Sequence, residues 1–263
     1  MQHDFRHWFS RKKLRIEAND AAETKMILNA ASDFQTVESY KGVRTNIMFS
    51  LPKSENSKKI LITSSEPGTG KTTTAINLAI TFAQTGAKVL LLDCDMRKTR
   101  VHRYLKRENT IGMSNVLCGY ATLDEAIQKD VAEGLDCIFA GNIPPNPVEL
   151  LASEEMAHIL SMLHTRYDYI FIDTPPLTVV TDAALVMAHC TGVILVTRLG
   201  MTGYELLDQA VDMLRRIDVR VLGFLVLHDG AGRKRLGGYG KGYKYRYENA
   251  YADSLERRRK KND

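Results

Sequence analysis

The chain has 263 residues, a hydrophobic fraction of 44% and a formal net charge of +5, which suit one large α/β domain with tails. No apolar run approaches the roughly 20 residues that span a bilayer, and the first residues lack the apolar core of a signal peptide. The cysteines at 94, 118, 137 and 190 form no C-x-x-C pair, so free thiols in a reducing cytoplasm are expected rather than disulfides or zinc.

The positive charge is concentrated at the C-terminal end. Residues 229–263 contain eleven Lys or Arg against five Asp or Glu, whereas the rest of the chain is close to neutral. A basic tail indicates nucleic-acid binding less strongly than a basic domain face does, and the chain has no nucleic-acid reader motif. No nucleic-acid partner is therefore expected.

Residues 1–35 predict an N-terminal arm outside the main domain. Phe5, Trp8 and Phe9 recur at helical spacing beside several basic residues. This pattern is compatible with a small amphipathic helix on an acidic membrane surface or a partner. The alternative is a disordered or core-docked arm.

A helix is predicted over residues 36–50. It places Glu38, Lys41 and Arg44 on one side. On an isolated protein such a row is a solvated face with ordinary ion pairs. The functional alternative is a contact between subunits.

The next stretch carries the strongest motif. A short apolar strand (residues 60–63) leads into a glycine-containing loop (64–70), and Lys71 opens an apolar helix. This is the context of a P-loop, in which backbone N–H groups and a lysine hold the phosphates of a nucleotide. The expected ATP-binding residues are Glu66, Gly68, Thr69, Gly70, Lys71, Thr72 and Thr73.

One position departs from the usual P-loop pattern, because Ser65 replaces the first glycine. The alternative interpretation is a glycine-rich turn followed by a surface lysine. The flanking strand and helix favour the nucleotide site.

Two later strands end in carboxylates. Residues 88–95 run into Asp93 and Asp95, and residues 167–173 end in Asp173. Carboxylates at the C-terminal ends of parallel strands lie in the crevice where α/β sheets bind ligands. An aspartate that ends a strand downstream of a P-loop is the arrangement that holds Mg²⁺, together with the Thr72 hydroxyl.

The remaining sequence alternates between strands and helices. Asn146 is expected to cap one helix that continues past Leu163. Asp182 is expected in the first turn of another helix, and Thr202 with Glu205 is expected to form the capping box of a third. Residues 97–132 predict a basic loop and two short helices, and further strands are expected over 135–140, 192–197 and 219–227. At least six strands alternating with helices predict a three-layer α/β domain with a mainly parallel sheet over residues 36–228, and a flexible tail over 229–263.

The P-loop, the segment Asp93-Cys-Asp-Met-Arg-Lys98 and the segment Asp173-Thr-Pro-Pro176 together resemble the Walker A, A′ and B motifs of the bacterial tyrosine kinases, or BY-kinases. The resemblance covers residues 36 to about 228 and extends along the tyrosine-rich tail to 251. It implies the P-loop NTPase fold, with a three-layer sandwich and a disordered C-terminal tail. The absence of an apolar span resembles the two-protein form of the family, in which a cytoplasmic kinase works with a membrane adaptor at the inner face of the plasma membrane.

The resemblance also implies an activity. It predicts an ATP- and Mg²⁺-dependent tyrosine kinase that controls synthesis and export of capsular or extracellular polysaccharide, opposed by a cognate phosphatase. Lys71, Asp93, Asp95 and Asp173 would be catalytic, and Thr72, Asp93 and Asp173 would hold Mg²⁺. Either Asp95 or Asp93 would accept the tyrosine proton.

The family interface motif Glu-x-x-Arg-x-x-Arg occurs here as Glu38, Lys41 and Arg44, which implies a ring of subunits, an octamer in this family. Lys41 departs from the motif and lacks the planar fork of arginine. Leu227-His228 stands where the family has an asparagine near the adenine.

The tail contains the expected phosphorylation sites, Tyr239, Tyr243, Tyr245, Tyr247 and Tyr251. A glycine-rich, basic segment cannot build a core, so we expect it to be disordered and to enter the site of a neighbouring subunit. The alternative is a basic aromatic tail that binds nucleic acid.

A nucleotide switch of the partitioning or septum-positioning ATPases is the alternative function. Those proteins carry a second lysine early in the P-loop, near the position of Glu66. The acidic residue at this position favours the kinase, because the second lysine is missing. The fold alone would not separate the two classes.

Overall fold

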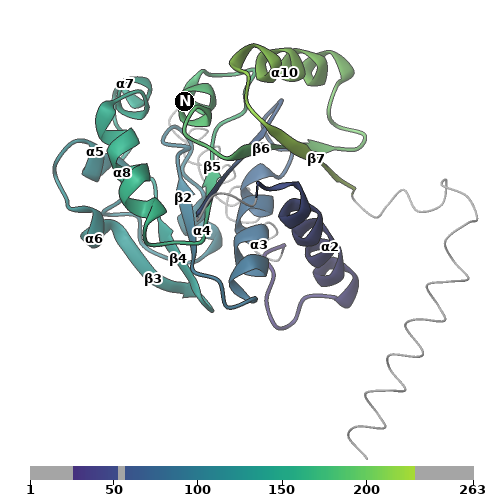
Figure 1. Ribbon diagram of the computed structural model, residues 1–263, viewed down its shortest axis with the longest axis horizontal. Helices are drawn as coiled ribbons and strands as arrows, with labels where there is room; N and C mark the ends of the chain where they lie inside the picture. Colours follow the sequence, from purple (N-terminus) through teal and green to yellow (C-terminus); the bar gives the residue numbers. More distant parts are fainter. Residues whose placement is uncertain (1–25, 53–56, 229–263) are drawn as a thin grey trace, which may run out of the picture. The chain divides into compact units, whose positions relative to one another are not determined.

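The computed structural model describes residues 26–52 and 57–228 (Figure 1). Its helices are α2 (Phe34–Ser50), α3 (Lys71–Ala83), α4 (Val101–Tyr104), α5 (Met113–Leu117), α6 (Leu123–Ala126), α7 (Pro147–Leu151), α8 (Glu154–His164), α9 (Asp182–Met187) and α10 (Tyr204–Ile217). Its strands are β1 (Lys58–Ser64), β2 (Val89–Asp93), β3 (Ile127–Ala132), β4 (Leu135–Ile138), β5 (Tyr169–Asp173), β6 (Gly192–Arg198) and β7 (Val221–Leu227).

The described strands form one seven-stranded sheet in the order β3-β4-β2-β5-β1-β6-β7. All neighbouring pairs are parallel except β3 and β4. Since parallel strands end at the same edge, the residues that follow β1, β2 and β5 lie together. The predicted P-loop NTPase fold with a mainly parallel sheet is confirmed.

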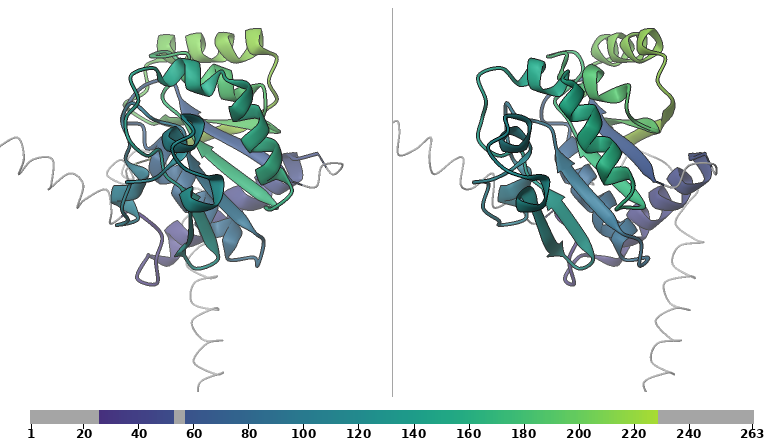
Figure 2. Two further views of the ribbon diagram at one scale, coloured as in Figure 1. Left: turned by 90° about the vertical axis from the view of Figure 1, so that its left-hand side faces the viewer. Right: turned by 60° about the vertical axis from the view of Figure 1, so that its left-hand side comes forward.

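The sheet is buried on both faces, which explains its nearly continuous apolar strands. In β1, Ile60 and Ile62 pack with α2 and α3, whereas Leu61 packs with α8, α9 and α10. Figure 2 shows α8 on one side of the sheet and the P-loop helix on the other. These helices complete the three layers.

Two expectations about the middle of the chain are wrong. Residues 127–132, expected to be loop or helix, form β3, which pairs antiparallel with β4 at the sheet edge. The helix expected to run from Asn146 past Leu163 is interrupted between α7 and α8. The Asn146 side chain makes no capping hydrogen bond, whereas Ser153 accepts one from the Met156 N–H and restarts the helix as α8.

The capping box expected at the start of α10 is also absent. The cap residue is Gly203, which has no side chain to offer. The Thr202 hydroxyl instead accepts a hydrogen bond from the Arg198 N–H at 2.9 Å. Thr202 therefore stabilises the turn that leaves β6.

Helix α2 packs on the P-loop helix. The Arg44 guanidinium donates a hydrogen bond from Nη1 to the Thr81 carbonyl of α3 at 2.6 Å. Glu38 and Lys41 form an exposed ion pair of 2.8 Å with each other. The predicted interface row thus divides into an exposed pair and an arginine that holds two helices together.

Part of the segment before α2 also packs on α3. Leu28 donates its N–H to Asn77 Oδ1 at 2.9 Å, and Asn77 Nδ2 donates to the Met26 carbonyl at 2.9 Å. Ile27 and Leu28 are buried by this contact.

The predicted aromatic arm around Phe5, Trp8 and Phe9 lies outside the described residues, as do the five tail tyrosines. Within residues 26–52 and 57–228, none of the helices has the length and apolarity needed to cross a membrane.

Candidate nucleotide and phosphoryl-transfer site

The loop between β1 and α3 has the backbone shape that a phosphate site needs. Gly68 and Gly70 adopt φ values of 84° and 97°, in the left-handed region that favours glycine. A Cβ at Gly70 would lie 2.6 Å from Leu227 Cδ1 of β7. The first turn of α3 has no side-chain cap, so its N–H groups remain available to an anion.

The other predicted loop residues support this shape. The Glu66 carbonyl accepts hydrogen bonds from the hydroxyls of Ser64 at 2.8 Å and Thr69 at 3.4 Å. Thr69 is buried, whereas Thr73 lines the cavity beside the loop. Glu66 therefore shapes the loop through its backbone.

Lys71 lies at the centre of a charged cluster. Its Nζ lies 3.0 Å from Asp95 Oδ2, 3.4 Å from Asp173 Oδ1 and 3.3 Å from Thr72 Oγ1. Only 8% of Lys71 is exposed, which excludes the alternative of a surface lysine. The structure brings together residues from three separate motifs.

The sheet explains this convergence. Asp93 and Asp173 end neighbouring parallel strands and are directly paired in register. The Cys94 N–H donates to the Asp173 carbonyl at 2.8 Å, which extends the pairing beyond β2. Asp93 Oδ1 in turn accepts the Asp95 N–H at 3.1 Å and turns the chain toward Lys71.

The cluster holds more negative than positive charge. Burial, and then the charges of Asp173 and Asp95, raise the pKa of Asp93 well above its usual value. Burial also raises the pKa of Asp173, although Lys71 opposes this shift. For Lys71, burial favours a lower pKa, but the carboxylates of Asp173 and Asp95 outweigh it and raise the pKa.

The residues present fit a magnesium ion that is shared with a nucleotide. Asp93 Oδ2 is buried and has no hydrogen-bond partner, which leaves an oxygen available to a cation. No three His, Cys, Asp or Glu side chains of the described part of the chain form a complete metal site. Mg²⁺ commonly uses one or two carboxylates, with waters and phosphates as its other ligands.

A cavity of about 560 Å³ opens over the P-loop. Among its lining residues are Lys71, Thr72, Asp95, Arg97 and Arg198. Asp95 lines this cavity, whereas Asp93 and Asp173 are buried at the ends of their strands and are not among its lining residues. The cavity is large enough for a nucleotide.

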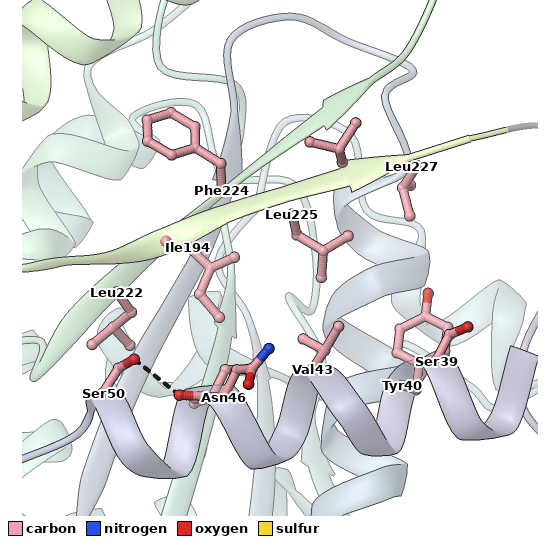
Figure 3. Close-up of a pocket in the computed structure, with 13 residues that line it drawn as sticks. Ser39, Tyr40, Val43, Asn46, Ser50, Ile194, Leu222, Phe224, Leu225 and Leu227 are labelled. Carbon is pink, nitrogen blue, oxygen red and sulfur yellow. Dashed lines mark hydrogen bonds between the residues drawn. The ribbon is translucent and has the colours of Figure 1, made fainter. Parts of the chain in front are cut away.

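A second cavity, of about 270 Å³, lies between α2 and β7 (Figure 3). Val43, Leu225 and Leu227 point into it, whereas Phe224 points away from α2. None of the predicted nucleotide ligands lines this groove. We therefore assign the site to the cavity over the P-loop.

One half-buried ion pair next to the site was not predicted. Asp182 is the first residue of α9, as expected, but its carboxylate is 0% exposed and binds Arg97 through two contacts of 2.9 and 3.1 Å. The sequence offers no local signal for this pair, because 85 positions separate the two residues.

The sheet and its glycine loop define a nucleotide-binding P-loop protein. Residues 57–221 match the family described as "AAA domain". The chain is 40% identical to the tyrosine-protein kinase YwqD of Bacillus subtilis over 189 residues, which cover 72% of this chain and 79% of that protein.

Solved structures point to the same group. The kinase domain of the Escherichia coli tyrosine kinase ETK superposes with a TM-score of 0.71 at 32% identity, over 78% of this chain and 80% of that one. The chimerical protein CapA2B2 superposes with a TM-score of 0.69 at 36% identity, over 72% of this chain and 83% of that one. The chain belongs to the bacterial tyrosine-protein kinases, as predicted.

The comparisons also bear on chain length and on the alternative. The chain spans only 29% of the longer tyrosine-protein kinase wzc of Salmonella typhimurium, with 33% identity. The septum site-determining protein MinD of Pyrococcus horikoshii is less similar, with 27% identity and a TM-score of 0.58 over 68% of this chain and 72% of that one. The kinase interpretation is therefore favoured over the switch.

Proposed function

We propose that this kinase transfers the γ-phosphoryl group of ATP to protein tyrosines, chiefly those of its own C-terminal tail in a neighbouring subunit. The convergence of Lys71 with Asp95 and Asp173 beside a P-loop carries the proposal. In the transfer, the tyrosine oxygen bonds to the γ-phosphorus, the bond from that phosphorus to the bridging oxygen breaks, and ADP leaves.

Asp95 is the base that we propose for the tyrosine proton. It lines the cavity and is 6% exposed, whereas Asp93 is fully buried. Its Oδ1 accepts the Lys98 N–H at 3.0 Å, which fixes the carboxylate. Asp93 would position Asp95 through the N–H that it accepts.

Lys71 and the P-loop would bind the triphosphate. The ammonium is held here by two carboxylates, so nucleotide binding exchanges some of these contacts for phosphate oxygens. Mg²⁺, held by Thr72, Asp93 and Asp173, would neutralise phosphate charge. Positioning and charge stabilisation supply most of the catalysis in such a transfer.

We also propose the cellular setting implied by the family. The kinase would form a ring, an octamer by resemblance, through α2 and would be held at the inner face of the plasma membrane by a membrane adaptor. It would regulate capsular or extracellular polysaccharide synthesis and export, and a cognate phosphatase would reverse the phosphorylation. The similarity to CapB of Staphylococcus aureus and to CapA2B2 supports this setting.

The direct test is to incubate the purified full chain with Mg-ATP and its adaptor and to blot for phosphotyrosine. Phosphotyrosine that depends on both ATP and Mg²⁺ is expected. Hydrolysis of ATP without any phosphotyrosine would instead favour the nucleotide switch.

Replacing Tyr239, Tyr243, Tyr245, Tyr247 and Tyr251 by phenylalanine should remove nearly all autophosphorylation and leave ATP binding intact. Each phosphate adds about −1.5 to −2 charge, so phosphorylation would reverse the positive charge of the tail and release it from a neighbour. Mass spectrometry should place the phosphate on these tyrosines. Phosphate found mainly on Tyr40, Tyr104 or Tyr169 would contradict the proposal.

Glu38→Lys should convert the unphosphorylated ring to monomers in light scattering. The change replaces the exposed Glu38–Lys41 pair by two like charges on the proposed contact. Asp212→Lys is a matched control, because Asp212 forms a similar exposed pair with Arg215 on α10 at 3.2 Å. Equal masses for both variants and the wild type would discard the α2 contact.

A further inference from the structure

Arg97 lines the nucleotide cavity, and the buried carboxylate of Asp182 holds its guanidinium in place. Its Nε and Nη2 donate to the two carboxylate oxygens of Asp182 at 2.9 and 3.1 Å. Asp182 is 0% exposed, whereas 41% of the Arg97 side chain is exposed. The inner edge of the guanidinium is therefore buried and the rest of the group is accessible.

The accessible part lies in the site. Arg97 lines the same cavity as Lys71 and Asp95. Its remaining amino group, Nη1, has no partner among the described residues. An arginine has five N–H donors in a rigid fork, so two contacts with Asp182 leave donors for a second ligand.

The carboxylates of the site outnumber the ammonium group of Lys71, so a second cation would help to stabilise added negative charge. Lys71 already contacts Asp95 and Asp173, and Asp93 adds a third carboxylate beside them. During transfer, negative charge spreads over the three outer oxygens of the phosphoryl group. A fixed cation aimed at such charge stabilises the transition state more than a mobile one, since it needs no reorganisation.

We propose that Arg97 is a second cationic ligand of the transferred phosphoryl group and that Asp182 is the positioning residue that presents it. The inference rests on the proposed phosphoryl transfer. Asp182 anchors Arg97 from α9, so the arginine comes from the same subunit as Lys71. The structural alternative is an ion pair that only ties the loop after β2 to α9.

The test compares binding of Mg-ADP with binding of Mg-ADP plus aluminium fluoride, which mimics the phosphoryl group in transit. In the wild type, aluminium fluoride should tighten binding. Arg97→Ala should lose about 100-fold of that tightening, as for removal of one oxyanion donor, with little change in ADP affinity. Arg97→Lys should retain part of it, because it keeps the charge without the fork.

Two further variants separate positioning from folding. Asp182→Asn keeps the charge of Arg97 but loosens its anchor, so an intermediate loss is expected. Arg166→Ala removes an arginine that pairs with Asp124 on the surface, and it should bind like the wild type. Thermal melting of each variant would show that it is folded.

Arg97→Ala and Arg97→Lys variants with the full wild-type tightening, and only a lower melting temperature, would overturn the proposal in favour of the structural alternative. A wild type without any tightening would overturn it as well. A wild type that tightens but forms no phosphotyrosine would contradict the kinase function, whereas the same binding series would still decide the role of Arg97.

Discussion

Lys71→Met should abolish phosphotyrosine formation, with a loss of at least about 100-fold in rate. The methionine removes the only ammonium of the described P-loop cluster, so the triphosphate loses a fixed charge. It also leaves Asp95 and Asp173 buried without their partner, and we expect a lower melting temperature. The measurement is phosphotyrosine per folded molecule with Mg-ATP and adaptor.

Lys129→Met is a suitable control for this substitution. Lys129 pairs with Asp136 at 2.7 Å on the far edge strand β3, outside the nucleotide cavity. It should lose little activity. Lys71→Arg tests folding separately, since it keeps a cation in the cluster. Phosphorylation that persists in the methionine variant would refute the assigned role of Lys71.

Asp93→Asn should reduce kinase activity by about 100-fold or more and at the same time stabilise the metal-free protein at neutral pH. Burial, with Asp173 and Asp95 close by, raises the pKa of Asp93 in the folded state. Such a group contributes stability below its unfolded pKa of 3.8 and loses that contribution as the pH rises through the folded pKa. The neutral amide avoids this loss, and its oxygen can still accept the Asp95 N–H.

The measurement is thermal melting with EDTA between pH 4 and 8, in which the advantage of Asp93→Asn should grow as pH rises. Asp136→Asn is a control for which the opposite change in stability is expected. Burial raises the pKa of Asp136, but hydrogen bonds from Lys129 and Tyr167 outweigh it and lower the pKa. That carboxylate stabilises the protein above its unfolded pKa, so its amide variant should be less stable at neutral pH. Equal pH profiles for both variants would contradict the charge balance described for the site.

The meeting of Lys71 with the aspartates was largely predictable, because each of these residues ends or follows a strand of the mainly parallel sheet. An apolar strand followed by Gly70-Lys71 fixes the phosphate loop, and aspartates at strand ends must meet at one edge of a parallel sheet. The partners within the cluster were less predictable. Which carboxylates contact Lys71 depends on strand register, which no local pattern encodes.

The errors arose where local patterns conflicted with tertiary packing. Thr122 and Glu125 form a capping box that starts α6, but that helix ends after four residues and the chain continues as β3. In β3 only Ile127 and Val131 are buried, so the strand lacks the alternation that would have identified it. The contact of Arg97 with Asp182 depends on a loop and a helix far apart in sequence, and no spacing rule could indicate it.

The hydrogen bond from Arg44 to the Thr81 carbonyl has a thermodynamic consequence. It joins α2, the helix proposed to contact the neighbouring subunit, to α3, which begins with Lys71. If a neighbour that docks on α2 shifts α3 through this bond, the affinity for nucleotide would change. Because such coupling is reciprocal, nucleotide would change the association constant of the subunits by the same factor. The proposed ring assembly and nucleotide binding would then be thermodynamically linked, so that a change in one shifts the equilibrium of the other.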